Sequence, residues 1–533
     1  MLAPRGAGGS IDSERLGMGE SWRPKPGDRF VRPRRIRPFR LRRVLGIPGL
    51  FSIGYGDVGS SIYYALGVIA MAALGATPIA VGIAALIYVF NALTYAEGSA
   101  MITEGGGSAS YARAAFNDLI GFVSGWAMML TYVVTVAIAA YTIPPYLGHF
   151  WPVLSQPVPG AMTSMGIVLF LMLVNVVGIG EWSGLNILFV TIDVLAQITL
   201  IVLGILLIFV PKPGTLFEHM FGAGNWPSTS NLIYGIAIAA LCFTGIESIA
   251  QHSEETRQPE KKMPQTYILM VVTVFILFAG ISLVALTAVP PQVLGDPVNG
   301  WARDPVAGIA SAISTAIVPD QIAGGIQSAS ARELVVALLS TVRDILPGLV
   351  AVLATVILLM ATNTAMLGIS RLTYNMSKTR QLPAALSRIH YRFRTPYPAI
   401  ILFSIVSILL LVPGVGRGPF FTNLAALYVF GSLIVFASAH ASILRLRMRR
   451  PEMERPIKLP GNVRLGGYEF PVTAMLGLAF TTVIWWVVVV RRPFSWGTGV
   501  VWLAAGLALF YLYRRSQGLS LFHLPPAKGD DRK

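Results

Sequence analysis

The run Gly54-Tyr-Gly-Asp-Val-Gly-Ser-Ser61 interrupts an otherwise apolar segment over residues 46–73. It places three glycines and one carboxylate, Asp57, near the centre of a stretch long enough to cross a bilayer as a helix. A carboxylate at that depth is energetically costly and therefore indicates a functional position. A second run of this kind, Phe243-Thr-Gly-Ile-Glu-Ser248, interrupts the sixth apolar segment along the chain.

The composition is that of a membrane protein. The chain has 533 residues, of which 54% are hydrophobic and only 12% are charged, whereas soluble proteins carry about 25% charged residues. We therefore predict an all-α polytopic membrane protein with about twelve transmembrane helices. The predicted spans are 46–73, 78–101, 119–146, 161–180, 186–210, 231–252, 266–290, 347–377, 397–413, 422–446, 470–490 and 496–514.

The basic residues predict the orientation of the chain. The net charge is +16, and Arg and Lys cluster in residues 1–43, 371–394 and 445–464, which fall on one side once the spans are counted. By the positive-inside rule both termini are cytoplasmic and the protein lies in the cytoplasmic membrane. A basic tail can also bind nucleic acid, but the apolar background disfavours that interpretation.

The segments outside the spans are assigned from composition. Residues 1–43, rich in Pro, Gly and Arg, are expected to form a disordered cytoplasmic tail, and residues 515–533 a second cytoplasmic tail. The connection 291–346 is expected to be extracytoplasmic, with short helices at Pro305–Ile317 and Ala331–Leu346. The first span lies too far along the chain, and is too long, to be a signal peptide.

The two interrupted segments lie five helices apart, and such pairs are typical of transporters built from inverted repeats with a midplane site. Backbone groups freed by a helix break in a membrane must line a cavity or bind a ligand. We therefore predict that the first span is unwound near Gly56–Ser60 and the sixth near Thr244–Glu247. We also predict that the two breaks lie side by side.

Three further motifs resemble the amino acid–polyamine–organocation permease superfamily. They are Tyr95-Ala-Glu-Gly-Ser-Ala-Met-Ile-Thr-Glu-Gly-Gly-Gly107, Glu254-Glu-Thr-Arg-Gln-Pro-Glu-Lys-Lys-Met-Pro264, and Ser370-Arg-Leu-Thr-Tyr-Asn-Met followed by Gln381-Leu-Pro and Thr395-Pro. The resemblance extends from about residue 46 to about residue 450. It implies a core of five plus five helices in inverted repeat over 44–450, with two appended helices in 451–514.

Asp57 is the principal candidate for the solute site, with a structural carboxylate as the alternative. The amides of Gly59, Ser60 and Ser61 are expected to begin a second half-helix whose positive end faces a substrate carboxylate. Tyr64 lies seven residues after Asp57 and therefore on the same helix face.

The first-span run also resembles the first-helix motif of the potassium uptake permeases, a branch of the same superfamily. That resemblance implies a site made of Asp57, Tyr64, Thr135, Thr244 and Tyr428, with K⁺ as the ligand. Gly56 belongs to the same motif. The amino acid permeases carry no charge in this break, so Asp57 favours a cationic partner, which would be K⁺, a coupled proton or the amine of a solute.

The remaining candidates lie on the fifth and sixth spans. Phe243 is expected to gate the site, Gly245 belongs to the break, and Glu247 either couples protons or anchors the freed amides. Asp193 is a further candidate for proton coupling, because it lies near the position where some amino acid permeases carry a lysine linked to that coupling. Glu97 and Glu104, at the membrane edge, are expected to be structural, with Arg113 or Arg371 as partners.

The sequence favours a secondary transporter. It contains no nucleotide-binding motif, metal-ligand cluster or catalytic constellation, so we expect no enzyme activity, cofactor or bound metal. The expected function is import of amino acids or related small amines, driven by protons, and the alternative is proton-coupled potassium uptake. A channel would need an open pore rather than two interrupted helices. The expected partners are a small solute, H⁺ and membrane lipid, and the solute and oligomeric state stay open.

Overall fold

Helices make up most of the described chain in a computed structural model of the protein. The structure describes residues 43–178, 183–325, 327–415, 420–465 and 467–522. The predicted N-terminal tail lies outside these described residues except for Arg43, and the predicted C-terminal tail lies outside them from residue 523 onward.

The elements follow one another with short connections. The helices of the first half are α1 (Ile47–Val58), α2 (Ile62–Ala73), α3 (Thr77–Met101), α4 (Ser108–Ala115), α5 (Asp118–Leu147), α6 (Pro157–Val177), α7 (Ser183–Gly204), α8 (Gly214–Phe221), α9 (Thr229–Ala239), α10 (Glu247–Gln251) and α11 (Pro259–Ala288). Those of the second half are α12 (Pro291–Leu294), α13 (Pro305–Ala316), α14 (Pro319–Ile322), α15 (Ala329–Lys378), α16 (Tyr397–Leu411), α17 (Phe420–Arg449), α18 (Val472–Arg491) and α19 (Pro493–Ser516). Short 3-10 segments connect some of these helices. They include η2 (Gly59–Ser61) between α1 and α2, η3 (Leu74–Ala76) between α2 and α3, and η6 (Ala240–Phe243) after α9.

Eleven helical runs in the described chain are long and apolar enough to cross a membrane. One of them, Ile47–Met101, has 55 residues. At ~1.5 Å per residue it would extend for about 80 Å, more than twice the ~30 Å hydrocarbon layer. Leu74 ends α2 with a φ of 46°, a conformation that breaks a right-handed helix. Divided at Leu74, this run supplies two passes, and the described spans then match the twelve predicted segments.

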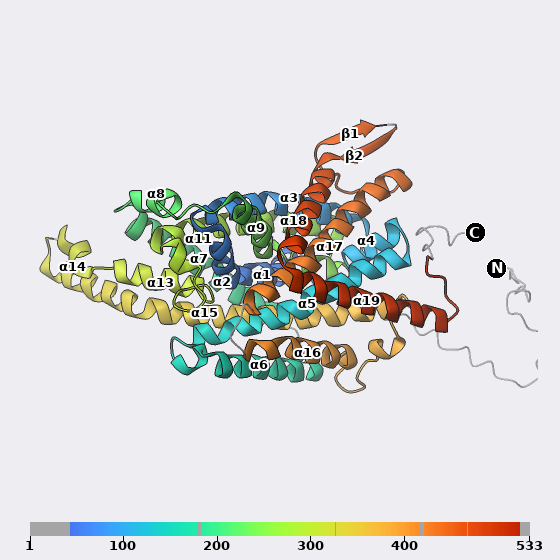
Figure 1. Ribbon diagram of the computed structural model, residues 1–533, viewed down its shortest axis with the longest axis horizontal. Coiled ribbons are helices and arrows are strands. Elements are labelled where there is room, and N and C mark those ends of the chain that lie inside the picture. Colours follow the sequence, from blue (N-terminus) through green and yellow to red (C-terminus); the bar gives the residue numbers. More distant parts are fainter. Residues whose placement is uncertain (1–42, 179–182, 326, 416–419, 466, 523–533) are drawn as a thin grey trace, which may run out of the picture. The chain divides into compact units, whose positions relative to one another are not determined.

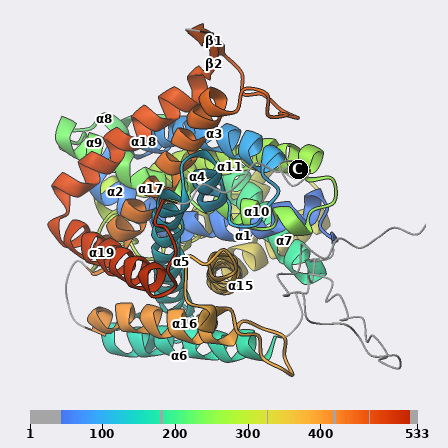
Figure 2. The same cartoon turned by 90° about the vertical axis from the view of Figure 1, so that its right-hand side faces the viewer.

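Helices α6 and α16 pack side by side and form a pair at one edge of the bundle (Figures 1 and 2). Helices α5 and α15 contact both members of this pair and connect them to the remaining helices. α15 is 50 residues long and includes the stretch Ala331–Leu346. The prediction of a separate short helix there is wrong, because Pro347 continues the helix rather than ending it. The other expected short helix is present as α13.

A β-hairpin follows α17 and was not foreseen from the sequence. Strand β1 (Asn462–Leu465) pairs antiparallel with β2 (Tyr468–Pro471) and projects beyond the helices (Figure 1). The chain leading to it is fixed by Glu97, whose carboxylate accepts hydrogen bonds from Arg447 Nε at 2.9 Å and from Leu459 N at 2.8 Å. Glu97 therefore joins α3 to α17.

The partners suggested for Glu97 were wrong. Arg113 instead pairs with Asp118 at 2.8 Å, and Arg371 lies 3.5 Å from Glu255. The correct partner, Arg447, lies 350 residues further along the chain. Local spacing in the sequence gives no indication of a pair so distant.

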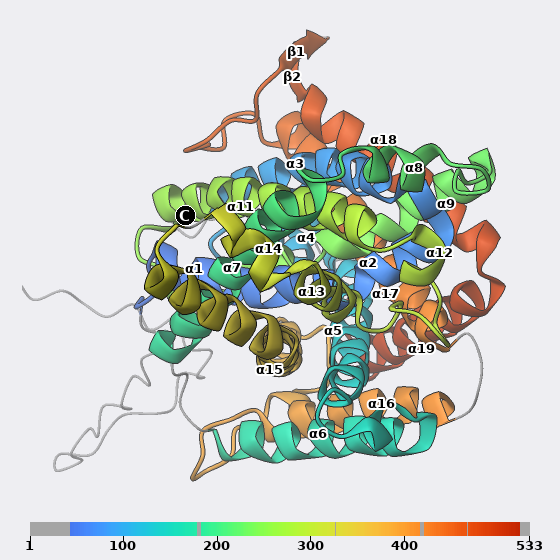
Figure 3. The same cartoon turned by 90° about the vertical axis from the view of Figure 1, so that its left-hand side faces the viewer.

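The chain before α1 and the connector after α10 lie at one end of the bundle. Val44 N donates to Glu255 O at 2.9 Å and Arg257 N donates to Leu45 O at 3.0 Å, so the two segments form a short parallel bridge. Figure 2 views the molecule from the end that carries α4 and α10. Figure 3 views the opposite end, where α8, α12, α13 and α14 lie.

Labelling of single cysteines tests the predicted orientation of these two ends of the bundle. Cys242 is the single cysteine and is buried, so a Cys242→Ala background allows single-site labelling. We expect an impermeant maleimide to label Ser330→Cys on intact cells, because the start of α15 is predicted to be extracytoplasmic. Lys261→Cys, in the connector after α10, should react only after the membrane is permeabilised. Labelling of Lys261→Cys on intact cells would reverse the orientation.

Candidate functional site

The sixth span is broken where the sequence predicted. η6 ends at Phe243, Thr244 is extended with φ −92° and ψ 160°, and Gly245 has a φ of 104°. A φ of this kind favours glycine because a Cβ atom would clash with the backbone. α10 then begins at Glu247, so the break exposes backbone groups between two helical pieces.

Glu247 satisfies part of this break. Its Oε2 atom accepts a hydrogen bond from Gly245 N at 2.9 Å, and Ser248 Oγ donates to Gly245 O at 2.6 Å. The Glu247 side chain is 1% exposed. This is the anchoring role that the sequence analysis gave as one of two interpretations.

The first span is not unwound. Val58, Gly59 and Ser61 all keep right-handed helical dihedrals, and α1 passes into α2 through the single 3-10 turn η2. Ser60 Oγ donates to Asp57 O at 2.8 Å within this turn. The prediction of a break at Gly56–Ser60 is therefore wrong for this conformation.

The glycines of the first span serve close packing instead. A Cβ atom on Gly54 would lie 2.5 Å from Ile249 of α10, and one on Gly59 would lie 2.5 Å from the ring of Tyr55. Glycine thus permits α1 to approach α10. Sequence alone does not distinguish a glycine that frees the backbone from one that admits a neighbour.

Asp57 meets the break of the sixth span directly. A Cβ atom on Gly245 would lie 2.7 Å from Asp57 Cγ, so only glycine allows this approach. The Asp57 side chain is 3% exposed, and its Oδ1 atom has no hydrogen-bond partner among the described residues. A buried carboxylate oxygen without a donor is unusual and costly.

Several predicted residues gather around this carboxylate. Tyr64 lies beside it and shares a 3.2 Å hydrogen bond with Ser61. Tyr428 of α17 lies close to Asp57, Tyr64 and Thr244. The hydroxyl of Thr244 donates to Leu241 O at 2.9 Å.

Two predicted residues have their described contacts elsewhere. Thr135 donates to Thr131 O of its own helix at 2.9 Å, as helical threonines commonly do. The ring of Phe243 packs against Tyr88 and Phe278, with centroids 5.3 and 5.4 Å away. Their roles in binding and gating stay predictions.

Asp193 of α7 has a complete set of partners. Tyr63 donates to its Oδ1 atom at 2.6 Å, and Tyr55 and Gln197 donate to Oδ2 at 3.0 and 2.8 Å. The two tyrosines lie on either side of Asp57 in sequence, so Asp193 fixes the first span around the candidate site. Sequence reasoning missed both, although their spacing of eight residues places them on one helix face.

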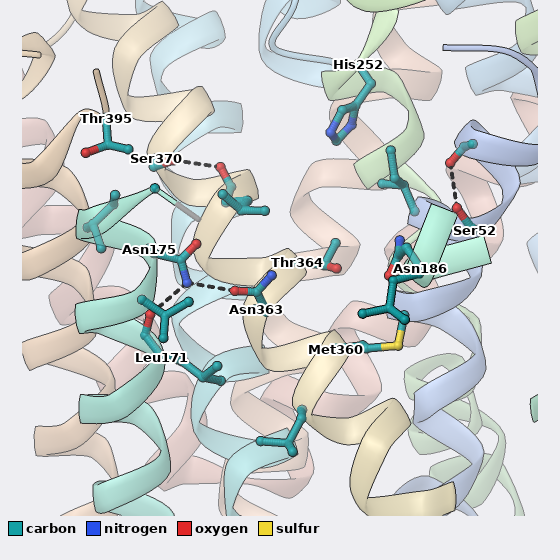
Figure 4. A pocket seen from close by; sticks show the side chains of 18 of the residues that line it. Ser52, Leu171, Asn175, Asn186, His252, Met360, Asn363, Thr364, Ser370 and Thr395 are labelled. Carbon is teal, nitrogen blue, oxygen red and sulfur yellow. Dashed lines mark hydrogen bonds between the residues drawn. The ribbon is translucent and has the colours of Figure 1, made fainter. Parts of the chain in front are cut away.

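A cavity of about 620 Å³ lies between α1, α6, α7, α15 and α16. Figure 4 shows its polar groups, of which Asn175 and Asn363 are joined by a 2.7 Å hydrogen bond. Asp57 does not line it. Thr364 lines the cavity, and its hydroxyl oxygen lies 4.0 Å from the position that a Cβ on Gly56 would take, so one residue of the cavity wall lies close to the backbone next to Asp57.

The opposite end of the bundle is closed over α2. A Cβ atom on Gly67 would lie 2.2 Å from Ala302 O, and one on Gly295 would lie 2.6 Å from Met71 N. The chain between α11 and α13 therefore packs directly on α2, without an intervening layer. Asp57 is thus covered from this end, whereas the cavity approaches it from the other.

The amino acid permease family matches residues 50–517. The chain belongs to this family. The superfamily resemblance of the sequence motifs is thereby confirmed, whereas the likeness of the first span to the potassium branch is not tested by it.

The relatives of this chain are named for different solutes. The chain is 26% identical to a branched-chain amino acid permease of Bacillus subtilis, over 89% of this chain and 94% of that one. It is 25% identical to a methylthioribose transporter of the same organism, over 90% and 95%, and 23% identical to its glutamate/serine transporter, over 89% and 82%. These relatives support transport as the general activity of the chain and leave the solute open.

The contact between Gly245 and Asp57 predicts that Gly245 tolerates no side chain. Gly245→Ala should lower the initial rate of solute uptake by about tenfold or more, because a Cβ both strains a positive φ and displaces Asp57. Gly166→Ala on α6, where a Cβ meets nothing within 4 Å, is the matched control. Uptake is measured per amount of protein in the membrane. Equal rates for the two variants would contradict the assigned contact.

Proposed function

We propose that this permease imports an amino acid or related small amine, with the solute amine or a coupled proton bound at Asp57. The observation that carries the proposal is a buried carboxylate, packed against a broken helix, whose Oδ1 atom has no hydrogen-bond partner in the described part of the chain. Such an oxygen needs a donor or a cation to offset its desolvation. A protonated amine and a transported proton both meet that need.

The three intramembrane acids differ in their partners, and this difference supports the choice of Asp57. Asp193 accepts three hydrogen bonds from side chains, and Glu247 accepts from the backbone of the break. Both are thereby held in place. Asp57 retains an oxygen that a ligand can use, so we assign solute or proton binding to it and positioning to Asp193.

The broken sixth span supplies the rest of the proposed solute site. The extended Thr244 and the positive φ of Gly245 interrupt the regular helical hydrogen bonding beside Asp57. Interrupted backbone of this kind commonly binds the polar ends of a solute in transporters. The 620 Å³ cavity, whose wall includes Thr364 close to Gly56, is the proposed path between this site and the cytoplasm.

Potassium uptake is the second candidate. The hydroxyls of Tyr64, Thr244 and Tyr428 lie near Asp57, and oxygen atoms are suitable ligands for a hard cation. Against it, the relatives compared above are named for organic solutes. The two candidates predict different behaviour for one substitution.

Asp57→Asn distinguishes them in proteoliposomes supplied with labelled amino acids, polyamines or ⁸⁶Rb⁺, with and without a pH gradient. If Asp57 carries the proton, the amide should abolish gradient-driven accumulation yet preserve solute exchange, since exchange moves no net proton. If Asp57 binds the amine of the solute, both activities should fall, and uptake of ⁸⁶Rb⁺ should be absent from the parent protein.

The remaining outcomes are equally specific. Uptake of ⁸⁶Rb⁺ by the parent protein, lost at every pH in Asp57→Asn and weakened in Tyr64→Phe, would establish the potassium candidate, because an amide does not balance a dehydrated cation. Full accumulation of an organic solute by Asp57→Asn would show that Asp57 is structural. The solute site would then be assigned to the backbone of the sixth-span break.

The positioning role of Asp193 predicts a different phenotype. Asp193→Asn should lower the uptake rate and the melting temperature together, because hydrogen bonds to a charged group contribute ~1.5–3 kcal/mol each. The ratio of accumulated to external solute should be kept, since the proton is assigned elsewhere. Thr191→Val, an exposed position on the same helix, is the control. Loss of accumulation with unchanged exchange would assign proton coupling to Asp193 instead.

A further inference from the structure

A second cavity, of about 250 Å³, lies at the end of the bundle that carries α8 and α12. Four helices contribute to its lining, which includes Met71 of α2, Asn231 and Tyr234 of α9, Thr422 of α17, Arg491 at the end of α18, and Arg492 directly after it. It is distinct from the cavity of Figure 4, with which it shares no residue.

The two adjacent arginines give this cavity an excess of positive charge. Arg492 Nε donates to the hydroxyl of Tyr234 at 2.8 Å, and its guanidinium lies 5.3 Å from the centre of the same ring. Arg491 contacts the Ser230 hydroxyl. Within the described parts of the chain, neither arginine forms an ion pair with a carboxylate.

This arrangement is suited to an oxyanion. A guanidinium presents five N–H donors, and the described contacts use only a few of them. Stacking on Tyr234 fixes the plane of Arg492, so its remaining donors are oriented before a ligand binds. Paired guanidinium donors match the two oxygens of a carboxylate.

The cavity lies on the approach to Asp57. Tyr64 precedes Met71 by seven residues on α2, which is two helical turns or about 10 Å. Tyr428 follows Thr422 by six residues on α17, and α9 leads directly to the broken segment at Thr244. The helices that line the cavity are therefore those that form the candidate solute site.

We propose that this cavity is an entry subsite in which Arg491 and Arg492 bind the carboxylate of an incoming amino acid. The proposal rests on the function proposed above for its physiological ligand, but the anion site itself does not depend on Asp57. A phospholipid headgroup offers the same oxyanion chemistry, so the experiment must separate a free solute from a lipid.

The test uses isovalerate, which has the carboxylate and side chain of valine but no amine, and therefore has no group for Asp57 to bind. Saturation-transfer-difference NMR on the purified full-length protein in detergent measures its binding. We expect binding to the parent protein and at least ~10-fold weaker binding to Arg491→Gln/Arg492→Gln, since two charge-assisted contacts are lost. Lys212→Gln, an exposed cation at the same end, should bind as the parent does.

Asp57→Asn separates the two proposals. It should leave isovalerate binding unchanged even where it abolishes amino acid uptake, so failure of the central site is distinguishable from failure of the entry subsite. In uptake assays the double arginine variant should raise the KM for L-leucine with little change in the maximal rate. Arg491→Gln alone, at an exposed position, provides the test if the double variant does not fold.

Two results would overturn the entry subsite. One is equal isovalerate binding by the parent protein and the double variant, or absence of binding to either. The other is displacement of isovalerate by phosphatidylglycerol, but not by phosphatidylcholine, at stoichiometric amounts of lipid, because the arginines would then serve as a lipid headgroup site. Binding that persists in nanodiscs containing phosphatidylglycerol supports a solute site.

Discussion

The burial of Asp57 against the sixth-span break is the constraint from which the rest of the site follows. A carboxylate in a bilayer interior must be matched by donors or by a cation. Gly245 brings the backbone break to within van der Waals reach of Asp57 Cγ, and Oδ1 keeps no partner in the described chain. The hydrogen bonds of Tyr55 and Tyr63 to Asp193 hold the first span on both sides of this carboxylate.

Asp193, unlike Asp57, is held in place by hydrogen bonds to both of its carboxylate oxygens. Its three side-chain donors come from α7 itself and from the first span on both sides of Asp57. Any shift of α1 relative to α7 must break charge-assisted hydrogen bonds. The position of Asp57 is thus set by a network in which Asp57 takes no part, which leaves Asp57 available to a ligand.

Access to Asp57 differs between the two ends of the bundle. The segment around Ala302 lies against Gly67 of α2, whereas the wall of the 620 Å³ cavity includes His252 and also Thr364, which lies close to Gly56. A transporter that alternates between two open states would have to lift this segment from α2 to admit solute from the other side. The arginine-lined cavity lies beside the same part of α2.

Much of the fold follows from the sequence because apolar length is a strong signal. The spans and the break at Thr244–Gly245 were both predicted. The break predicted in the first span is absent from the structure. The glycines there leave room for Ile249 and for the ring of Tyr55 and do not unwind the backbone. The pairing of Glu97 with Arg447, the Asp193 network and the hairpin at 462–471 depend on contacts between distant segments, which single-sequence patterns do not contain.

The central claim is that the ligand of this permease binds at the free oxygen of Asp57. An experimental structure of the protein with the solute identified by the uptake panel tests it most directly. The account predicts a donor nitrogen or a cation about 3 Å from Asp57 Oδ1, with the solute in contact with Gly245. A solute bound away from Asp57, for example at the amides of Asn175 and Asn363, would contradict it.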